Sequence, residues 1–427
     1  INGKHLCQHR CGYTAFTIDI TEDVLYGENN LLTVKVNSKE SVNQPPFGFV
    51  IDYMTYGGIY RNVYLEVKNL IYCSDVFYKP TFTIAPNTSA ISRKQLLEMQ
   101  LPGEVVTEML LSEEAKKLAQ ERKLEIRQLL DDKEISRQPM DISGITKTLA
   151  GNVFLWDIEN PVVYQMKTEL LVDDEVVDSY ETLIGFREAV FKKDGFYLNG
   201  RKVKIRGLNR HQSYAYVGYA MPESMQRLDA SILKKELGLN AVRTSHYPQS
   251  QSFMEECDRL GLLVFTEMPG WQHIGEADWK DVAVSNVEEM ILQYRNHPSI
   301  ILWGVRINES PDDDEFYQRT NDTAHRLDPT RQTGGVRCNK KMNLLEDVYT
   351  YNDFVHSGKN EGCESKDKVT PDMNKPYLIS EYNGHMFPTK TFDCEEHVLE
   401  HTMRHVRVLD AVAEQEDIAG SFGWCMF

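Results

Sequence analysis

Two glutamates in this chain follow short apolar runs, in the positions that acid–base chemistry at a sugar bond requires. Glu309 comes after the run 300–305, and Glu381 follows the run 377–380. Asn308, directly before Glu309, could hold a sugar hydroxyl next to the reacting carbon. Retaining hydrolysis of a glycosidic bond uses two carboxyl groups about 5–5.5 Å apart, one as nucleophile and one as acid and then base. The two glutamates therefore indicate a glycosidase, provided that the fold brings them together.

Other polar and aromatic side chains stand at the ends of neighbouring apolar runs. Imidazoles there can bond sugar hydroxyls, guanidinium groups can hold a nucleophile ionised, and an aromatic ring can cover the apolar face of a sugar. Each also has a purely structural alternative, such as an internal ion pair, core packing or, for Glu309, a carboxylate near a helix start at Pro311. The candidates are His211, His246, Arg206, Arg243, Glu267 and Trp424.

A barrel fold would bring these residues to one place. From about residue 187 onward, apolar runs of strand length alternate with stretches of helical period, as in a parallel α/β fold. Eight such strands predict a (β/α)₈ TIM barrel over residues 187–427, whose last helix would follow Phe427 and whose chemistry sits at the strand ends. The predicted strands are 203–206, 241–244, 262–266, 300–305, 333–336, 348–351, 377–380 and 418–424.

The first 186 residues have the pattern of β structure. Residues 1–70 alternate apolar and polar positions between turn clusters, which predicts a jelly-roll β-sandwich that is incomplete at its N-terminus. Residues 71–186 also read mostly as strands and predict an immunoglobulin-like β-sandwich. Within them, 112–138 fits either a helix or strands, and we favour an exposed charged turn with two edge strands. Because the chain starts at Ile1 without methionine, we expect it to be a fragment.

Composition excludes several classes of partner. With 47 basic and 64 acidic residues the formal charge is −17, which argues against nucleic acid and anionic membranes as partners. The eight cysteines form no CxxC pair, so we expect no structural zinc site and assign the chain to the reducing cytoplasm. No apolar run approaches the roughly 20 residues of a membrane span. The oligomeric state stays open, with a homo-oligomer among the alternatives.

Several longer motifs make the chain similar to glycoside hydrolase family 2, the family of bacterial β-galactosidases and β-glucuronidases. This resemblance implies a jelly-roll, an immunoglobulin-like sandwich and a catalytic barrel, with Glu309 as acid/base and Glu381 as nucleophile. It also implies that the sugar site includes Asp52, His211, His246, Trp424, a tyrosine at or near Tyr351, and His385 after the nucleophile. The matching stretches are residues 57–63, 156–161, 185–187, 206–211, 243–248, 296–299, 303–309 and 380–382.

The chain departs from the family pattern at two places near the strand ends. Ile307 stands where family members usually have glycine before the Asn-Glu pair. The resemblance also implies a magnesium site after the third strand, but Trp271 occupies the place of its glutamate while His273 remains. We therefore expect no cofactor, and no dependence on magnesium.

These observations predict a retaining enzyme that cleaves terminal β-galactosyl residues from a small carbohydrate substrate. A β-glucuronidase is the nearest alternative, although a carboxylated sugar would need a cationic partner that this acidic chain does not obviously supply. A non-catalytic carbohydrate-binding protein on the same scaffold is the alternative from a different class, and such a protein would not need both carboxylates.

Overall fold

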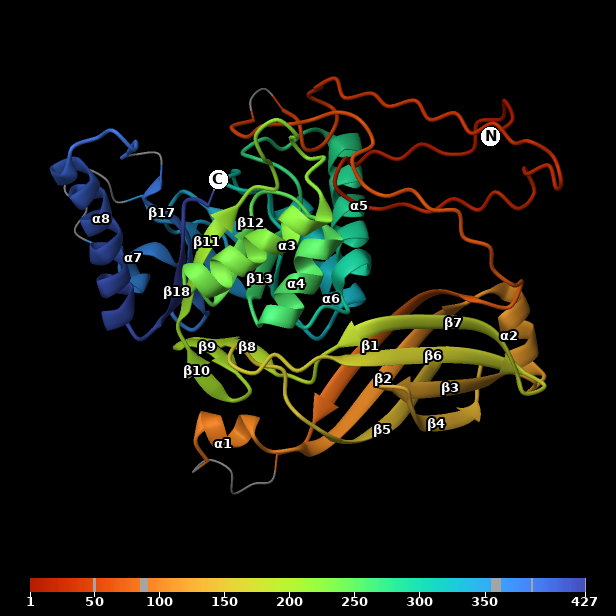
Figure 1. Ribbon diagram of the computed structural model, residues 1–427. Helices are drawn as coiled ribbons and strands as arrows, with labels where there is room; N and C mark the ends of the chain where they lie inside the picture. The colour runs from red at the N-terminus through yellow and green to blue at the C-terminus, as the bar shows by residue number, and fades with distance from the viewer. Residues whose placement is uncertain (49–50, 85–90, 355–361, 385–386, 427) are drawn as a thin grey trace.

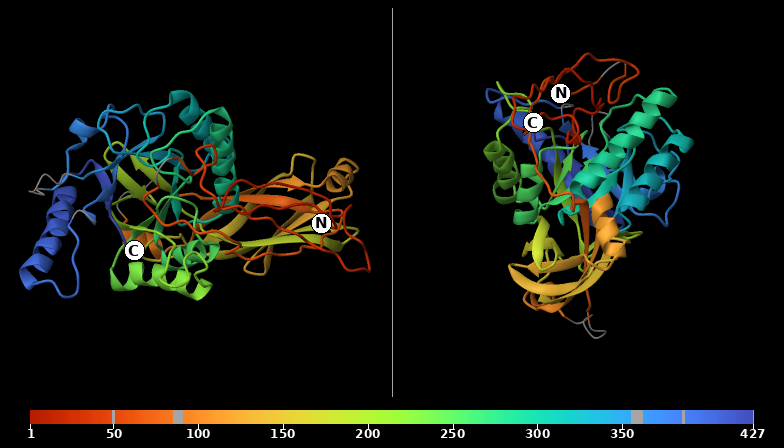
Figure 2. Two further views of the ribbon diagram at one scale, coloured as in Figure 1. Left: turned by 90° about the horizontal axis from the view of Figure 1, so that it is seen from above. Right: turned by 90° about the vertical axis from the view of Figure 1, so that its right-hand side faces the viewer.

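The computed structural model describes residues 1–48, 51–84, 91–354, 362–384 and 387–426 (Figure 1). A β-sandwich and a closed barrel lie next to each other, and the N-terminal segment runs along the barrel beside α5 (Ala277–Tyr294). The views in Figure 2 show the sandwich at one end of the molecule and α8 (Glu395–Glu414) at the other. Within the described ranges, no helix combines the length and the apolar character needed to cross a membrane.

The sandwich consists of two antiparallel sheets, with strand orders β1-β2-β5 and β4-β3-β6-β7. Side chains alternate between buried and accessible along β2 and β3, which is the pattern of strands with one face on a core. The predicted sandwich is therefore confirmed. Its strands are β1 (Cys73–Phe82), β2 (Leu101–Leu111), β3 (Glu125–Leu130), β4 (Lys133–Pro139), β5 (Ile145–Val153), β6 (Tyr164–Val172) and β7 (Glu175–Ile184), with helix α1 (Arg93–Leu97) before β2.

The preference for a charged turn within 112–138 was wrong for its first part, where helix α2 (Glu113–Gln120) forms. The Ser112 hydroxyl caps this helix by accepting a hydrogen bond from the Ala115 amide at 3.2 Å. Ala115 and Ala119 are buried on one face, four residues apart. The cap and the buried face together favour the helix over an extended turn. The remainder of the stretch forms the β3–β4 hairpin.

The barrel is closed by eight parallel strands in chain order, β11 to β18, as predicted. Strands such as β13 and β17 are buried at every position, because helices cover their outer side and packed side chains fill the interior. The strands are β11 (Ile205–Arg210), β12 (Ala241–Thr244), β13 (Leu263–Glu267), β14 (Ile300–Gly304), β15 (Gln332–Arg337), β16 (Val348–Asn352), β17 (Tyr377–Tyr382) and β18 (Ile418–Gly423). Between them lie α3 (Glu223–Ser231) with the π-helical turn η2 (Ile232–Glu236), α4 (Gln251–Leu260), α5, α6 (Asp314–Leu327), α7 (Lys366–Val369) and α8.

A small sheet of β8 (Ala189–Lys192), β9 (Gly195–Leu198) and β10 (Arg201–Val203) precedes the barrel. Phe191 and Phe196 from this sheet join the same buried cluster as Phe265 and Phe422 inside the barrel. The sheet therefore covers the end of the barrel at which the strands begin (Figure 1). The strand 203–206 was predicted too early, because 201–203 belongs to this sheet and the first barrel strand starts at Ile205.

The predicted jelly-roll does not form a sheet in this structure. Residues 1–48 and 51–70 contain neither helix nor strand. Alternating side chains stabilise a sandwich only when a second layer covers their apolar face. Val34 and Val36, which alternate with polar residues within the predicted β stretch 1–70, are exposed here, so no such layer covers them among the described residues. The segment instead contacts the barrel, for example where the Trp279 indole donates to the Phe47 carbonyl at 3.1 Å.

Candidate active site

Arg243, in β12, is the centre of a polar cluster at the carboxyl end of the barrel. Its side chain is fully buried. Nη1 donates to Glu381 Oε1 at 2.6 Å, while Nε and Nη2 donate to the two carboxylate oxygens of Glu267 at 3.0 and 2.7 Å. One guanidinium therefore joins the carboxylates from β13 and β17. A planar, permanently charged group with forked donors suits this task better than a lysine would.

Two asparagines complete the hydrogen bonds of this guanidinium. Nη2 donates to Asn308 Oδ1, and Nη1 donates to Asn209 Oδ1, each at 2.9 Å. The Asn209 amide group then donates to the Ser380 carbonyl at 3.0 Å, next to Glu381. The predicted residues Arg243, Glu267, Asn308 and Glu381 thus form one buried network. Such a fully bonded network holds its members in a single arrangement.

The pKa of Glu381 is raised to about 8, chiefly because the carboxyl is buried. Arg243 opposes this rise, while the negative charges of Glu309 and Glu267 add to it. A proton on Glu309 removes one of the charges that raise the Glu381 pKa, and so favours an ionised Glu381.

Glu309 has a different environment. Its carboxylate accepts hydrogen bonds from the side-chain amides of Asn352 at 2.9 Å and Gln272 at 3.2 Å, and no cation is among its hydrogen-bond partners in the described part of the chain. Its φ of 56° lies in the left-handed region, which costs a non-glycine residue about 1–3 kcal/mol. The amide of Glu309 donates to the Val336 carbonyl at 3.1 Å, which helps to hold this conformation.

Ile307, at the position where the family usually has glycine, fits into the barrel mouth without disrupting this loop. The side chain is fully buried. A Cβ built on Gly270, whose φ is 145°, would lie 2.6 Å from Ile307 Cδ1. The isoleucine therefore occupies space that glycine at position 270 leaves open.

His246, His211 and Trp424 form a wall beside Glu381. The Trp424 ring stacks on His246 with centroids 5.2 Å apart, and it meets His211 edge-on at 5.4 Å. His246 Nδ1 lies 2.8 Å from Glu267 Oε1, and His246 Nε2 lies 4.0 Å from Glu381 Oε1. Burial lowers the pKa of both imidazoles, that of His211 to about 3. The wall therefore offers neutral hydrogen-bonding groups and an aromatic face.

We expect His211 to stay neutral across the physiological range. Its pKa of about 3 lies below any working pH, because burial and the neighbouring Arg243 disfavour the imidazolium. Histidine-selective nitrogen NMR, assigned with His211→Asn, should show no titration of this ring between pH 5 and 8. His325 is the internal control, because its hydrogen bond to Asp347 raises its pKa. A His211 midpoint within that interval would contradict the described burial.

Two predicted site residues lie elsewhere. Arg206 is exposed on β11, three residues before the inward-facing Asn209, so alternation along the strand turns it away from the site. Tyr351 belongs to a buried cluster with Tyr349 and Ile379 and has no hydrogen bond to Glu381 among the described residues. Its neighbour Asn352 reaches Glu309 instead, because adjacent strand residues face opposite sides.

The N-terminal segment reaches the site through Tyr53. Its ring lies 5.5 Å from His211 and 5.8 Å from His246, measured between centroids. The predicted Asp52 is the preceding residue and is exposed. Burial raises the pKa of Tyr53, and the charge of Asp52 adds to this rise. It therefore lies at the edge of the site. The predicted His385 lies outside the described residues.

Four residues that contact the candidate site were not predicted from the sequence. Asn209 lies inside the motif 206–211, where the strand register would have selected it in place of Arg206. Asn352 could have been selected by the same argument over Tyr351. Tyr53 and Gln272 carry no local signal, because loops and a distant segment bring them to the site. Gln272 also has a positive φ of 56°.

The residues after β13 do not fit a magnesium ion. Both Glu267 oxygens accept hydrogen bonds from Arg243. His273 Nε2 lies 3.2 Å from the Val42 carbonyl, and its ring packs edge-on against Trp279. Among the described residues, no three His, Cys, Asp or Glu side chains converge as a metal site, and all eight cysteines are free thiols. We assign no chemical step to a metal.

Comparison with known proteins agrees with this fold. The family model described as Glycosyl hydrolases family 2, TIM barrel domain, matches residues 189–402, and the model Glycosyl hydrolases family 2 matches residues 98–187. A solved β-glucuronidase 2 from Bacteroides uniformis has the same fold, with a TM-score of 0.76 at 23% identity over 99% of this chain and 55% of its own.

Curated relatives match along the whole chain. The chain is 48% identical to a β-galactosidase of Thermoanaerobacterium thermosulfurigenes, over 100% of this chain and 59% of the relative. It is 42% identical to a β-galactosidase of Thermoanaerobacter pseudethanolicus, over 100% of this chain and 55% of that protein. The chain thus spans somewhat more than half the length of these relatives. With both family models matched side by side and such identity along its entire length, the chain belongs to family 2 of the glycosyl hydrolases.

Proposed function

We propose that this chain carries the catalytic site of a retaining β-glycosidase that removes terminal β-galactosyl residues. Glu381 attacks the anomeric carbon while Glu309 gives its proton to the leaving oxygen, so the glycosidic bond breaks as a glycosyl ester forms. Glu309, now a carboxylate, takes a proton from water. The oxygen of that water attacks the anomeric carbon, releases the sugar with its original configuration and frees Glu381.

The contrast between the two carboxyl environments carries this proposal. Glu381 is buried against the guanidinium of Arg243, which stabilises an anion. Among the described residues, the Glu309 carboxylate accepts hydrogen bonds only from neutral side-chain amides, and it keeps partial exposure to solvent. A group that must alternate between acid and base needs such a neutral, accessible environment. We therefore assign the nucleophile to Glu381 and the acid/base to Glu309.

A galactoside is the substrate that the site and the relatives support best. The curated relatives at 48% and 42% identity are β-galactosidases. Around Glu381, the imidazoles of His211 and His246 are neutral, and the charge of Arg243 is balanced by Glu267 and Glu381. Hydroxyl groups suit these partners. A carboxylated sugar would add a further negative charge without a spare cation in the described part of this cluster.

A β-glucuronidase is the second candidate. It is favoured by curated relatives such as a putative β-glucuronidase of Formosa agariphila, 32% identical over 90% of this chain. A non-catalytic carbohydrate-binding protein would have no use for two carboxyl groups in such different environments.

Hydrolysis of p-nitrophenyl β-galactoside, glucuronide, glucoside and mannoside by the full-length protein tests the proposal. We expect the galactoside to have the highest kcat/KM, and the rate to be the same in EDTA and in magnesium. A preference for the glucuronide would leave the roles assigned to the two glutamates unchanged but would overturn the assignment of a galactoside as substrate. No hydrolysis of any member by a folded protein would overturn the enzyme assignment.

A further inference from the structure

Helix α8, at the end of the molecule opposite the β-sandwich, carries three histidines at four-residue spacing (Figure 2). They are His397, His401 and His405. Residues four apart lie on one face of a helix, one turn above the other. Two of the three come into direct contact, because Nε2 of His401 lies 3.2 Å from Nε2 of His405. Both rings are half-buried, so solvent still reaches the pair.

The separation of the two nitrogens fits a shared metal ion. Zn²⁺ binds imidazole nitrogen at about 2.0–2.1 Å in tetrahedral geometry, so two nitrogens on one ion lie about 3.3 Å apart. Two histidines at i and i+4 on one helix face are an established way to present two ligands to zinc. Among the described residues no third His, Cys, Asp or Glu completes the set, so water would fill the remaining positions.

The surroundings of the pair orient its rings. His401 Nδ1 lies 2.8 Å from Thr389 Oγ1. A proton on Nδ1, donated to this hydroxyl, leaves the lone pair of Nε2 facing His405, and such a second hydrogen bond fixes the tautomer of most metal-binding histidines. The ring of Tyr382 meets the His405 ring edge-on at 5.7 Å. Burial lowers the pKa of both imidazoles, and the neutral ring is the form that binds a metal.

The guanidinium of Arg404 lies near the pair, and other groups balance its charge. It forms an ion pair with Glu400 at 3.3 Å and lies over the ring of Phe387, 4.2 Å from the centroid. Its positive charge is therefore partly neutralised by the carboxylate and the face of the aromatic ring.

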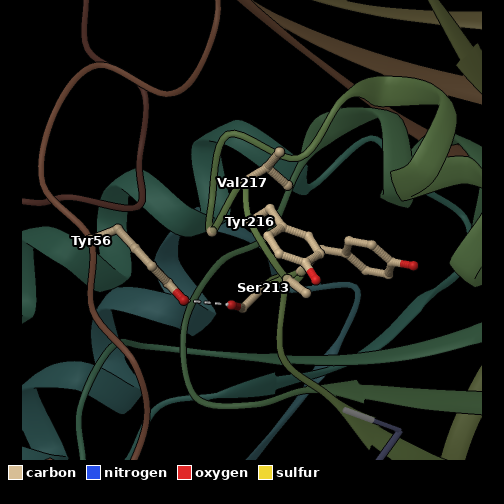
Figure 3. A pocket seen from close by; sticks show the side chains of 7 residues that line it. Tyr56, Ser213, Tyr216 and Val217 are labelled. Carbon is tan, nitrogen blue, oxygen red and sulfur yellow. Dashed lines mark hydrogen bonds between the residues drawn. The ribbon is translucent and has the colours of Figure 1, made fainter.

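Two other places in the described chain fit a transition metal less well. An open cavity of about 720 Å³ lies at the connection between β11 and α3, where Figure 3 shows Tyr56 pointing toward Ser213. Its lining, Tyr56 and residues 213–218, supplies hydroxyl and apolar groups but no imidazole, thiol or carboxylate. In the catalytic wall, His246 Nδ1 lies 3.0 Å from Arg243 Nη2, whose charge repels a cation.

We propose that His401 and His405 together bind one divalent transition-metal ion, with Zn²⁺ as the best fit. Imidazole suits Zn²⁺, Cu²⁺ and Ni²⁺, whereas Mg²⁺ and Ca²⁺ prefer oxygen ligands. The site is separate from the proposed reaction. The ion would brace α8 against β17 and the loop after it, because His405 contacts Tyr382 and His401 contacts Thr389.

Equilibrium dialysis of the metal-free full-length protein against Zn²⁺, followed by elemental analysis, tests the site. We expect the wild type to bind one more Zn²⁺ per chain than His401→Asn or His405→Asn, and the double variant to lose no more than either single one. His397→Asn is the matched control and should keep the wild-type number. His397 lies one turn earlier on the same helix, but its Nε2 lies 3.0 Å from the Pro388 carbonyl.

A second measurement identifies the ligands directly. The electron paramagnetic resonance spectrum of bound Cu²⁺ should show coupling to imidazole nitrogen in the wild type and in His397→Asn, and should lose this signal in the other two single variants. Equal Zn²⁺ content in the wild type, His401→Asn and His405→Asn would overturn the site. A loss of the same size in His397→Asn would also overturn it, because the effect would then come from the helix and not from two ligands. Neither result depends on which glycoside the protein cleaves.

Discussion

Replacing Glu381 by Gln is expected to lower kcat by about 10⁵-fold, the scale on which enzymes lose activity without their nucleophile. The amide is nearly isosteric with the carboxyl but cannot form the glycosyl ester. Turnover of p-nitrophenyl β-galactoside in the full-length protein measures the loss. Melting temperature should fall little, since an amide oxygen can still accept the hydrogen bond from Arg243.

Glu309→Gln is the matched control within the same site. This variant lacks the acid but keeps the nucleophile, so formation of the glycosyl-enzyme should be slowed far less for a dinitrophenyl galactoside, whose leaving group needs no proton, than for methyl galactoside. If Glu381→Gln showed this dependence on the leaving group and Glu309→Gln did not, the two roles would have to be exchanged.

Replacing Arg243 by Gln is expected to lower kcat/KM at pH 7 by at least about 100-fold and to cost about 3–5 kcal/mol of stability, because two buried carboxylates lose their cation. Arg243 lowers the pKa of Glu381, so its removal raises that pKa and reduces the ionised fraction of the nucleophile. The acid limb of kcat/KM should therefore move to higher pH, by roughly 1–3 units. A pH–rate profile and urea denaturation measure both effects.

Replacing Glu267 by Gln should move the acid limb of the kcat/KM profile to lower pH. The charge of Glu267 raises the pKa of Glu381, and the neutral amide removes that charge. Opposite shifts in Arg243→Gln and Glu267→Gln cannot come from a general loss of folding. An acid limb that stays in place in both variants would show that Glu381 does not control it. Arg243→Lys, which keeps the charge without the fork, should lie between wild type and Arg243→Gln.

The barrel could be predicted because its signals are local. Buried parallel strands are mostly apolar runs, and the run at β14 is bounded by clear turn and helix signals. The sheet β8–β10 was missed because three-residue and four-residue strands carry too little pattern. The N-terminal segment has the alternation of strands, yet pairing and a covering layer are properties of distant contacts that alternation does not encode.

At the site, the sequence indicated which residues lie near the strand ends better than it indicated which way their side chains face. Glu309, Glu381, His246 and Trp424 were proposed because each lies at or shortly after the carboxyl end of a predicted strand, and the structure places all four near that end of the barrel. Arg206 and Tyr351 lie on the right strands, but their side chains face away from the cluster. Asn209 and Asn352 lie on the opposite faces of the same strands and reach it. The joint contact of Arg243 with two carboxylates depends on three strands at once, so it appears only in the folded barrel.

Trapping of the covalent intermediate tests the central claim most directly. The full-length protein would be incubated with a 2-deoxy-2-fluoro-β-galactoside that carries a good leaving group, then digested and analysed by mass spectrometry. We predict one added fluorogalactosyl group, located on Glu381 and absent from Glu381→Gln. A label on Glu309 or Glu267, or turnover of the galactoside with no label on any carboxyl, would contradict the mechanism.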